Sequence, residues 1–361
     1  MLPYILMVST PAVLSLLFLW SRVEAKKANR TVVDVFFVIF LVLLLFRSER
    51  IGIDLPVYKM NFTNYTFLSW ERILNGIIES DFEAGFVIIS KMISYFTSNF
   101  RVMIIICALI AVIPIWILYR NEGQIGFFAT VMFVNIAPFA MYFSGLRQAM
   151  AMAFVMPCYY YCRDKKLWNY LLTIFLAFLF HRSALILLFM YPVYHLRLKK
   201  TYHIAYISPI IALMYIFKTP IFNFLLRFVG DYANEYADEI RETGAFAVTL
   251  LLAVLLIYAF LVADSDKIDY DTMGLRNIMI LSVILQVFSG VHSIAMRMNY
   301  YYLVLFPISV CKVVQCGNKK IKDIIHLSII CMVVFFFAYY IYFIHTDEDI
   351  LRIYPYISIF D

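Results

Sequence analysis

The sequence predicts an all-α fold, a polytopic bundle of transmembrane helices. Hydrophobic residues make up 64% of the 361 positions and charged residues only 15%, with a mean hydropathy of +0.84. This composition excludes an ordinary soluble domain. Apolar runs recur along the chain, and the turns that alternate with them are rich in lysine and arginine, as the positive-inside rule expects of cytoplasmic loops. We therefore expect a single integral membrane domain over residues 1–361.

The basic turns set the predicted orientation of each helix. They lie around residues 22–30, 163–166, 197–200 and 319–322 and are assigned to the cytoplasm. The apolar runs predict about 12 spans, at residues 3–20, 32–46, 102–119, 125–143, 149–161, 167–180, 184–195, 202–217, 245–262, 277–291, 298–314 and 324–345. Both termini then lie outside, together with two external loops, residues 47–101 and 218–244.

Some segments depart from simple spans. Residues 83–100 have apolar residues at helical spacing and predict an amphipathic helix at the membrane interface. The runs 167–180 and 184–195 are shorter than the roughly 20 residues that a full span needs. They predict either a dipping hairpin or discontinuous helices, because one long helix would place a basic loop outside. Pro138 predicts a kink.

The sharpest local signal is Ser144-Gly145-Leu146-Arg147-Gln148. A serine before an apolar helix is a good N-cap, and the helix dipole adds partial positive charge beside Arg147. Small residues at positions 145, 149 and 153 let a neighbouring helix approach closely. Such a helix start suits a bound anion. The alternative is an arginine that extends to the membrane surface.

Arginines mark the external side more generally. Arg147, Arg182 and Arg297 each begin a predicted inward-running helix. Arginines outnumber lysines on the predicted external side, whereas lysines prevail in the predicted cytoplasmic turns. To hold a turn on the cytoplasmic side, any positive charge is enough, and lysine serves. Arginine differs because its planar guanidinium binds phosphate oxygens in bidentate fashion. This pattern favours a phosphate-bearing ligand at the external membrane surface, which suggests a polyprenyl diphosphate that carries a sugar.

Motifs over roughly residues 45–305 together resemble the EpsG family of bacterial exopolysaccharide proteins, which is grouped with the Wzy-type O-antigen and capsule polymerases. The motifs occur in the family's order: Gly52-x-Asp54-x-x-x-Tyr58, Glu83-x-Gly85-Phe86, Ser144-Gly145-Leu146-Arg147-Gln148-Ala149, the basic turn Lys165-Lys166, Ala177-x-x-x-His181-x-Ser183-Ala184, and Arg297-x-x-Tyr300-Tyr301. Ile53 and Leu55 depart from the threonine and the aromatic residue that are usual in the family.

The resemblance implies a metal-independent glycosyltransferase of the bacterial inner (plasma) membrane. It would transfer a growing glycan from undecaprenyl diphosphate onto a lipid-linked oligosaccharide repeat unit at the outer face. The implied partners are that lipid-linked oligosaccharide and membrane lipid, with a chain-length regulator and a flippase of the same pathway as further candidates. No cofactor and no nucleic acid are expected.

The chemistry of this transfer indicates which residues carry it. The leaving diphosphate gathers negative charge, and arginines and helix N-termini can stabilise it. We predict Arg147 and Arg297 as this clamp, with Arg182 and Arg50 as further candidates. The remaining candidates for contact with the substrate are Ser144, Gln148, Tyr58 and Tyr300.

The acceptor hydroxyl needs a general base. The candidates are His181, Asp54 and Glu83. Imidazole has the most suitable unperturbed pKa, but a histidine at a helix end is often structural. The two carboxylates alternatively pair with the arginines, which is the role that we favour for them.

Other functions fit the sequence less well. A flippase or transporter of lipid-linked glycan would carry arginines along an inner cavity in both leaflets, and an acyltransferase would need His181 near a cytoplasmic acyl donor. Asp264-Ser265-Asp266 and Asp269-Tyr270-Asp271 resemble metal-binding D-x-D motifs, but their short turn favours a solvated acidic loop. The six cysteines form no C-x-x-C pair and predict neither a metal site nor a disulfide framework.

Overall fold

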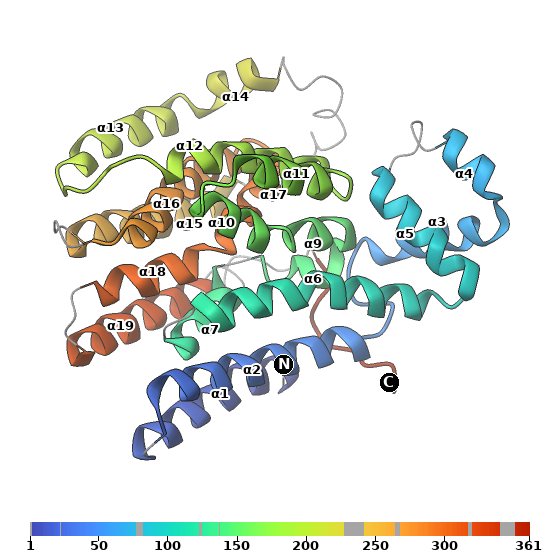
Figure 1. The fold of residues 1–361 in the computed structure, drawn as a ribbon, viewed down its shortest axis with the longest axis horizontal. Helices are drawn as coiled ribbons and strands as arrows, with labels where there is room; N and C mark the ends of the chain where they lie inside the picture. The colour runs from blue at the N-terminus through green and yellow to red at the C-terminus, as the bar shows by residue number, and fades with distance from the viewer. Residues whose placement is uncertain are drawn as a thin grey trace. The chain divides into compact units, whose positions relative to one another are not determined.

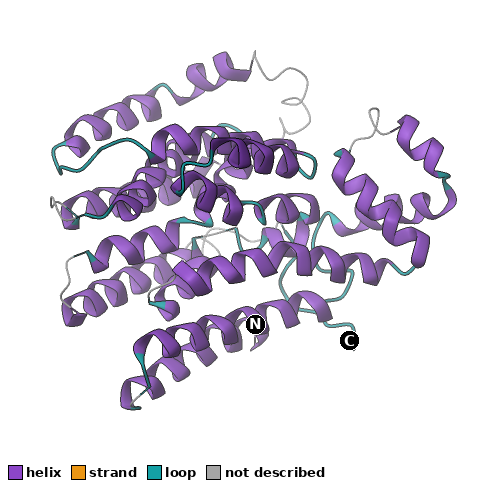
Figure 2. Cartoon of the chain, viewed as in Figure 1, coloured by secondary structure: helices purple, strands orange, loops and turns teal. Residues whose placement is uncertain are grey.

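Helices make up most of the described chain, and no strand is drawn among its residues (Figure 2). The computed structural model describes residues 2–21, 23–76, 82–122, 125–136, 138–226, 242–263, 268–316, 320–339 and 351–361. Within these ranges an isolated antiparallel bridge joins Arg47 to Ser358. The all-α prediction is confirmed.

The chain divides into two compact units. The first consists of residues 1–134, 138–185 and 346–361, and the second of residues 135–137 and 186–345. A single membrane domain that includes both units stays a prediction. Figure 1 labels the helices of each unit.

The first unit begins with long helices and continues in shorter ones. Its elements are α1 (Leu2–Trp20), α2 (Ala25–Phe46), α3 (Leu55–Phe67), α4 (Trp70–Gly76), α5 (Ala84–Phe96), α6 (Phe100–Glu122), α7 (Gly126–Asn135), α8 (Met141–Ser144), α9 (Leu146–Met152), α10 (Val155–Arg163) and α11 (Leu167–Phe178). The 3-10 helix η1 (Arg182–Phe189) leads into the second unit.

The second unit contains the remaining helices. They are α12 (Met190–Tyr194), α13 (His203–Ile216), α14 (Lys218–Leu226), α15 (Glu242–Val262), α16 (Tyr270–Ser289), α17 (Ser293–Leu303), α18 (Phe306–Gln315) and α19 (Lys320–Tyr339). Helix α14 occupies the start of the predicted external loop 218–244, while residues 227–241 of that loop lie outside the described residues.

Three described helices, α2, α6 and α16, are long and apolar enough to cross a membrane. The bent pairs α13–α14 (80°) and α17–α18 (45°) raise this number to five if each pair is one span. Most other apolar runs form helices of 10–17 residues in the described chain. The chain is thus a helical membrane protein, but the predicted number of about 12 spans is not confirmed.

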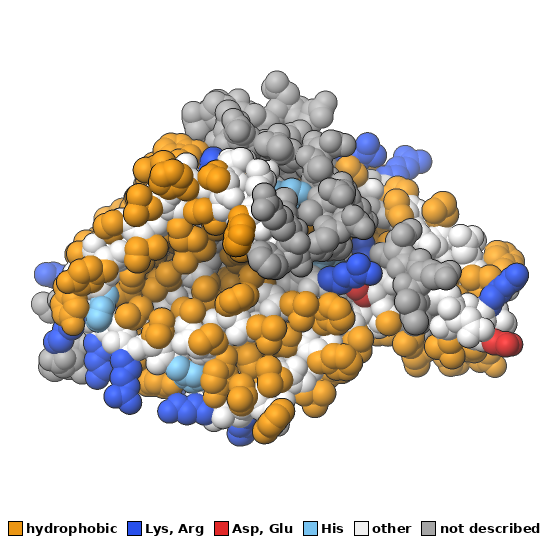
Figure 3. Space-filling model, turned by 90° about the horizontal axis from the view of Figure 1, so that it is seen from above, with side chains coloured by type: hydrophobic (Ala, Val, Ile, Leu, Met, Phe, Trp, Pro, Cys, Tyr) orange, Lys and Arg blue, Asp and Glu red, His pale blue; other side chains and the backbone are white. Residues whose placement is uncertain are grey.

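Apolar side chains cover much of the outer surface. On α19, Ile325, Ile329, Met332 and Phe336 are between 51% and 60% exposed, and their spacing places them on one side of the helix. Figure 3 shows apolar side chains over much of the described surface on one face, with lysines and arginines mainly at its margins. A surface of this kind suits lipid rather than water.

Several apolar runs are broken where the sequence suggested continuous or weakly bent helices. The run 125–143 stops at Asn135 and resumes as α8 at Met141, a gap that includes Pro138. The run that follows Ser144 forms two helices, α9 and α10. Residues 179–181 separate α11 from η1, as expected from the prediction that this segment does not form one long helix.

The helices α3, α4 and α5 gather around the N-terminal end of α6 (Figure 1). A core cluster that includes Tyr58, Phe86, Phe100 and Met150 joins α3, α5, α6 and α9. Buried Lys91 donates hydrogen bonds to the carbonyl oxygens of Tyr65 (2.8 Å) and Leu68 (2.6 Å) at the end of α3, where a cation complements the helix dipole. Helix α5 confirms a helix within the predicted range 83–100; its place at the membrane interface stays a prediction.

The C-terminal segment 351–361 packs along the link between α2 and α3. Gly52 N donates to Arg352 O (3.0 Å), Ile53 N to Leu351 O (3.1 Å) and Ser48 N to Ile357 O (2.9 Å). The hydroxyl of Tyr356 donates to Leu43 O at 2.9 Å. These bonds fix the link that carries Asp54 and satisfy its backbone groups.

Candidate functional site

Glu83 is the residue that joins the predicted motifs. It is the N-cap of α5, and its two carboxylate oxygens bind two different elements. Oε2 accepts a hydrogen bond from Arg147 Nη1 of α9 at 2.6 Å, and Oε1 accepts one from the backbone N of Arg182 at 3.0 Å. The side chains of Arg147 and Glu83 are only 14% and 7% exposed. A buried, hydrogen-bonded ion pair therefore ties α5, α9 and η1 together.

Aromatic rings complete the surroundings of Arg147. Its guanidinium carbon lies 4.3 Å from the centre of the Phe82 ring and 5.9 Å from that of Tyr58, within the range of cation–π attraction. Burial lowers the pKa of Arg147, but its interactions with Tyr58 and Glu83 outweigh burial and raise that pKa above its ordinary value. The guanidinium is thus charged and held in one orientation.

The start of α5 also lies against the turn that follows α11. Gly85 N donates to Leu179 O at 2.7 Å, and a Cβ on Gly85 would stand 2.7 Å from the same oxygen. A larger residue would push this turn away. The glycine of the Glu83-x-Gly85-Phe86 motif therefore permits the close approach that brings Glu83 to the first residue of η1.

Ser144 has a different role from the predicted one. The N-cap of α9 is Gly145, which has no side chain to cap the helix, and Ser144 is the last residue of α8. The Ser144 hydroxyl instead accepts a hydrogen bond from Asp54 N at 3.3 Å. The prediction of a serine N-cap is wrong, because the backbone turns one residue later and the hydroxyl binds the start of α3.

Asp54 is the half-buried N-cap of α3. Its carboxylate makes no hydrogen bond or ion pair with another described residue, and Tyr58 follows it by one helical turn. Because Tyr58 lies against Arg147, the Asp54 carboxylate and the Arg147 guanidinium belong to the same part of the first unit.

Arg47 is a site residue that the sequence reasoning missed. It is completely buried, and its Nη1 donates to the carbonyl oxygens of Phe143 and, at 3.3 Å, Tyr142. Arg47 directly follows a predicted span and was counted only among the external arginines, without a role of its own in the site. Its position five residues before Gly52 was the sequence feature that could have included it in the Gly52-x-Asp54-x-x-x-Tyr58 motif. The other arginine of this link, Arg50, is exposed, and its side chain contacts no described residue by hydrogen bond or ion pair.

A comparison with protein families shows the family of this chain. The model of the EpsG family matches residues 32–358. This chain belongs to the EpsG family. The match extends beyond the motifs at both ends and includes most of the C-terminal segment that packs on the link before α3. No curated protein and no solved structure matched the chain.

Membership of the EpsG family indicates a polysaccharide polymerase-like role, broadly that of a glycosyltransferase in polysaccharide biosynthesis. Together with the apolar helices it identifies a membrane protein.

His181 caps η1 in this EpsG-family chain. It is 2% exposed, and its Nδ1 lies 3.3 Å from Ser183 N and 2.7 Å from Ser183 Oγ. Because the Ser183 N–H points to Nδ1, this nitrogen is an acceptor and the ring proton belongs on Nε2. His292 does the same at the start of α17, where its side chain accepts from Ile294 N at 3.1 Å. Both histidines thus stabilise the start of a helix that carries a predicted arginine.

The other predicted residues are divided between the two units. Gln148 follows Arg147 in α9 and is buried. Arg297 and Tyr300 lie on α17 of the second unit, half-buried, beside Asn299, whose side chain donates to Gln286 Oε1 at 2.9 Å. The pairing of Arg147 with Arg297 in one clamp stays a prediction.

The acidic turn before α16 has structural partners where it is described. Asp269 caps α16 and accepts from Thr272 N at 2.9 Å, and Asp271 binds Lys312 and accepts from the Tyr194 hydroxyl at 2.6 Å. Asp264 and Asp266 lie outside the described residues. Within the described ranges, no group of three His, Cys, Asp or Glu side chains is placed to hold a metal ion.

Proposed function

We propose that this EpsG-family protein is a polysaccharide polymerase of the bacterial inner membrane. It transfers a growing glycan from undecaprenyl diphosphate onto a lipid-linked oligosaccharide repeat unit at the outer face. The observation that carries the proposal is the junction at Glu83, which holds a charged, buried arginine at a fixed place against Tyr58, one helical turn after Asp54 on α3. A fixed cation, with a carboxylate in the same part of the unit, suits a reaction in which a diphosphate leaves as a hydroxyl loses its proton.

Arg147 stabilises the leaving diphosphate. The guanidinium has five N–H donors, and the carboxylate of Glu83 accepts from one nitrogen. Glu83 and the Phe82 ring restrict the side chain, so little reorganisation is needed when negative charge develops on the leaving group. Glu83 is thus a positioning residue, since both of its oxygens already accept hydrogen bonds from Arg147 and Arg182.

Asp54 acts as the general base. Among the three candidates, Glu83 is committed to Arg147 and Arg182, and His181 Nδ1 is committed to Ser183. The Asp54 side chain is half-buried, and its carboxylate makes no hydrogen bond or ion pair with a described residue. Its backbone is fixed by Ser144 Oγ, which holds the carboxylate within the same unit as Arg147.

The proposed glycosyl transfer forms one bond and breaks one. The oxygen of the acceptor sugar hydroxyl forms a bond to the anomeric carbon of the growing glycan, and the bond between that carbon and the diphosphate oxygen breaks. Asp54 takes the hydroxyl proton, and undecaprenyl diphosphate leaves. The guanidinium of Arg147 stabilises the negative charge on the oxygens of the leaving diphosphate. Arg182, Arg297, Gln148 and Tyr300 remain candidates for further contacts with the substrate.

Reconstitution in liposomes tests the proposal. The full chain is supplied with purified undecaprenyl-diphosphate-linked repeat units, and we expect longer glycans together with free undecaprenyl diphosphate. Arg147→Lys should abolish this product, whereas Arg72→Lys, the same change at an exposed arginine of α4, should leave it intact. Movement of the lipid-linked unit across the bilayer without a longer glycan would identify a flippase instead.

A further inference from the structure

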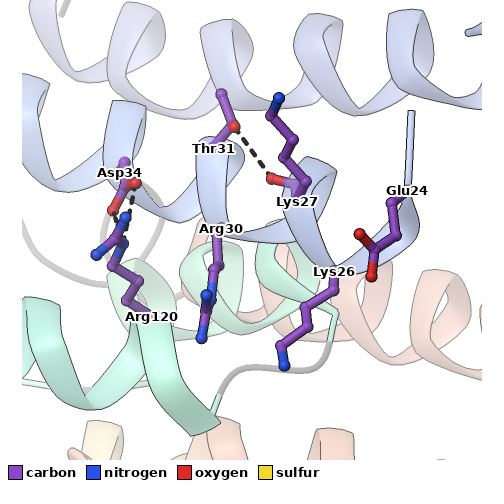
Figure 4. Close-up of a pocket in the computed structure, with 7 residues that line it drawn as sticks. All are labelled: Glu24, Lys26, Lys27, Arg30, Thr31, Asp34 and Arg120. Carbon is purple, nitrogen blue, oxygen red and sulfur yellow. Dashed lines mark hydrogen bonds and ion pairs between the residues drawn. The ribbon is translucent and has the colours of Figure 1, made fainter.

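A basic hollow lies in the first unit at the end of α6 opposite to α3 and α5. Its volume is about 450 Å³, and it is lined by the turn before α2, the first turns of α2 and the last turn of α6. Figure 4 shows Lys26 and Arg30 extending on one side of α2, with Arg120 of α6 nearby. The positive-inside rule assigns this turn to the cytoplasmic side.

The charges in the hollow do not cancel. Four lining residues are basic, namely Lys26, Lys27, Arg30 and Arg120, and two are acidic, namely Glu24 and Asp34. Arg120 Nε lies 3.0 Å from Asp34, and the Trp116 indole donates to the same carboxylate at 2.7 Å. Asp34 is therefore occupied, and no described carboxylate forms an ion pair with Lys26, Lys27 or Arg30.

The start of α2 adds to this positive field. Its N-cap, Glu24, makes no side-chain capping hydrogen bond, so the carboxylate leaves the first backbone N–H groups of α2 unbound, while its charge offsets one of the lining cations. A hollow of this volume accommodates a small polar group. Lys26 and Arg30, which extend on the same side of α2 (Figure 4), favour an anion, and phosphate oxygens form strong charge-assisted hydrogen bonds with lysine and arginine.

The surface beside the hollow indicates where such a phosphate comes from. Arg30 is followed at four-residue spacing on α2 by Asp34, Val38 and Val42, and side chains at this spacing are neighbours on the helix surface. Val38 is 45% exposed and Val42 43%. A basic end that continues into an exposed apolar strip suits a molecule with a phosphate head and acyl chains.

We propose that this hollow binds the phosphate of an anionic phospholipid, with Lys26 and Arg30 as its direct contacts and Lys27 and the start of α2 as added positive charge. Asp34 keeps Arg120 at the margin of the hollow. The same phosphate chemistry would accept a soluble phosphate, so the test separates these two sources. This site is distinct from the junction at Glu83 and does not depend on the proposed polymerase activity.

Native mass spectrometry of the full chain in detergent tests the site, with phosphatidylglycerol as the probe and phosphatidylcholine as the neutral lipid. Each cation beside the bound head group contributes about 5-fold to its binding, so K26Q/R30Q should weaken phosphatidylglycerol binding at the hollow about 30-fold. The control variant R197Q/K199Q removes two exposed charges from another basic turn. It should change phosphatidylglycerol binding at the hollow less than about 2-fold. Arg30→Lys, which keeps the charge, should retain binding.

The outcomes distinguish a lipid head-group site, a soluble-phosphate site and a general effect of net charge. Preferential phosphatidylglycerol binding that falls only in K26Q/R30Q supports a lipid head-group site. Competition by inorganic phosphate at millimolar concentration, without any preference for the anionic lipid, would show that the ligand is a soluble phosphate and overturn the lipid assignment. Equal losses in K26Q/R30Q and in the control double variant would overturn the site itself, because a general effect of net charge would then explain binding.

Discussion

The backbone of Gly52 lies directly against the carbonyl oxygen of Phe143. The φ of Gly52 is +106°, and a Cβ at this position would stand 2.3 Å from that oxygen. Arg47 Nη1 donates to the same oxygen. The link before α3 is thus fitted to the end of α8, one residue before Ser144 and four before Arg147.

Gly52→Ala is expected to lower both stability and activity. The new Cβ meets backbone rather than a flexible side chain, and the left-handed φ adds strain, so we expect a loss of about 1–3 kcal/mol or more in the free energy of unfolding. The measurement is the melting temperature in detergent together with the polymer yield. The matched control is Gly76→Ala, since a Cβ there meets nothing within 4 Å; equal melting temperatures for the two variants would contradict the close fit.

Glu83→Gln should destabilise the first unit. Removal of one partner leaves the buried Arg147 charge uncompensated, at a cost of about 3 kcal/mol. The exposed pair of Lys59 and Glu49 provides the control, because Glu49→Gln should cost about 1 kcal/mol or less. In a double-mutant cycle, Arg147→Gln should restore part of the stability lost in Glu83→Gln without restoring polymer. Additive losses in that cycle would show that the pair is not coupled.

Asp54→Asn should act on catalysis rather than on folding. The amide cannot accept the hydroxyl proton, so the rate of glycan transfer should fall about 10²- to 10⁴-fold. The melting temperature should stay near that of the unchanged protein, because the Asp54 carboxylate makes no hydrogen bond or ion pair with a described residue. A transfer rate within about tenfold of the unchanged protein would remove Asp54 as the general base.

His181→Asn distinguishes a cap from a base. Asparagine is a good N-cap, so it can replace the interaction of His181 Nδ1 with Ser183 N, and we expect more than a tenth of the transfer rate to remain. His181→Leu, which cannot cap, should lower the melting temperature by an amount that corresponds to about 1 kcal/mol. If His181→Asn is stable but loses transfer about 10²-fold or more, the histidine is the base and the assignment to Asp54 fails.

Composition and charge pattern were enough to predict the helical membrane fold, because lipid requires long apolar helices and basic turns mark one side. The same information could not give the number of spans. A kink at Pro138 and a discontinuity after residue 180 were expected. The extent of these breaks, and the unpredicted break at residues 153–154, depend on tertiary contacts, such as Gly85 N with Leu179 O, which local apolar patterns do not contain.

The candidate site was predictable in part. Glu83 and Arg147 were both found as motif residues. Pairing with arginine was the favoured role for both Glu83 and Asp54; the ion pair with Arg147 confirms it for Glu83, whereas the Asp54 carboxylate forms no ion pair with a described residue. The roles of Arg47 and Ser144 were not found, since each depends on a partner distant in the sequence: Arg47 binds Phe143 O, and Ser144 Oγ accepts from Asp54 N. Spacing within one segment carries no signal of such contacts.

The central claim is that Arg147 binds the leaving diphosphate of a polymerase. The most direct measurement is an analysis of the lipid-linked glycans in cells that depend on this protein, with Arg147→Lys in its place and insertion in the membrane verified. We expect polymer to disappear and single lipid-linked repeat units to accumulate on the outer leaflet, because an ammonium cannot bind phosphate in bidentate fashion. Unchanged polymer, or repeat units that accumulate on the cytoplasmic leaflet, would contradict it.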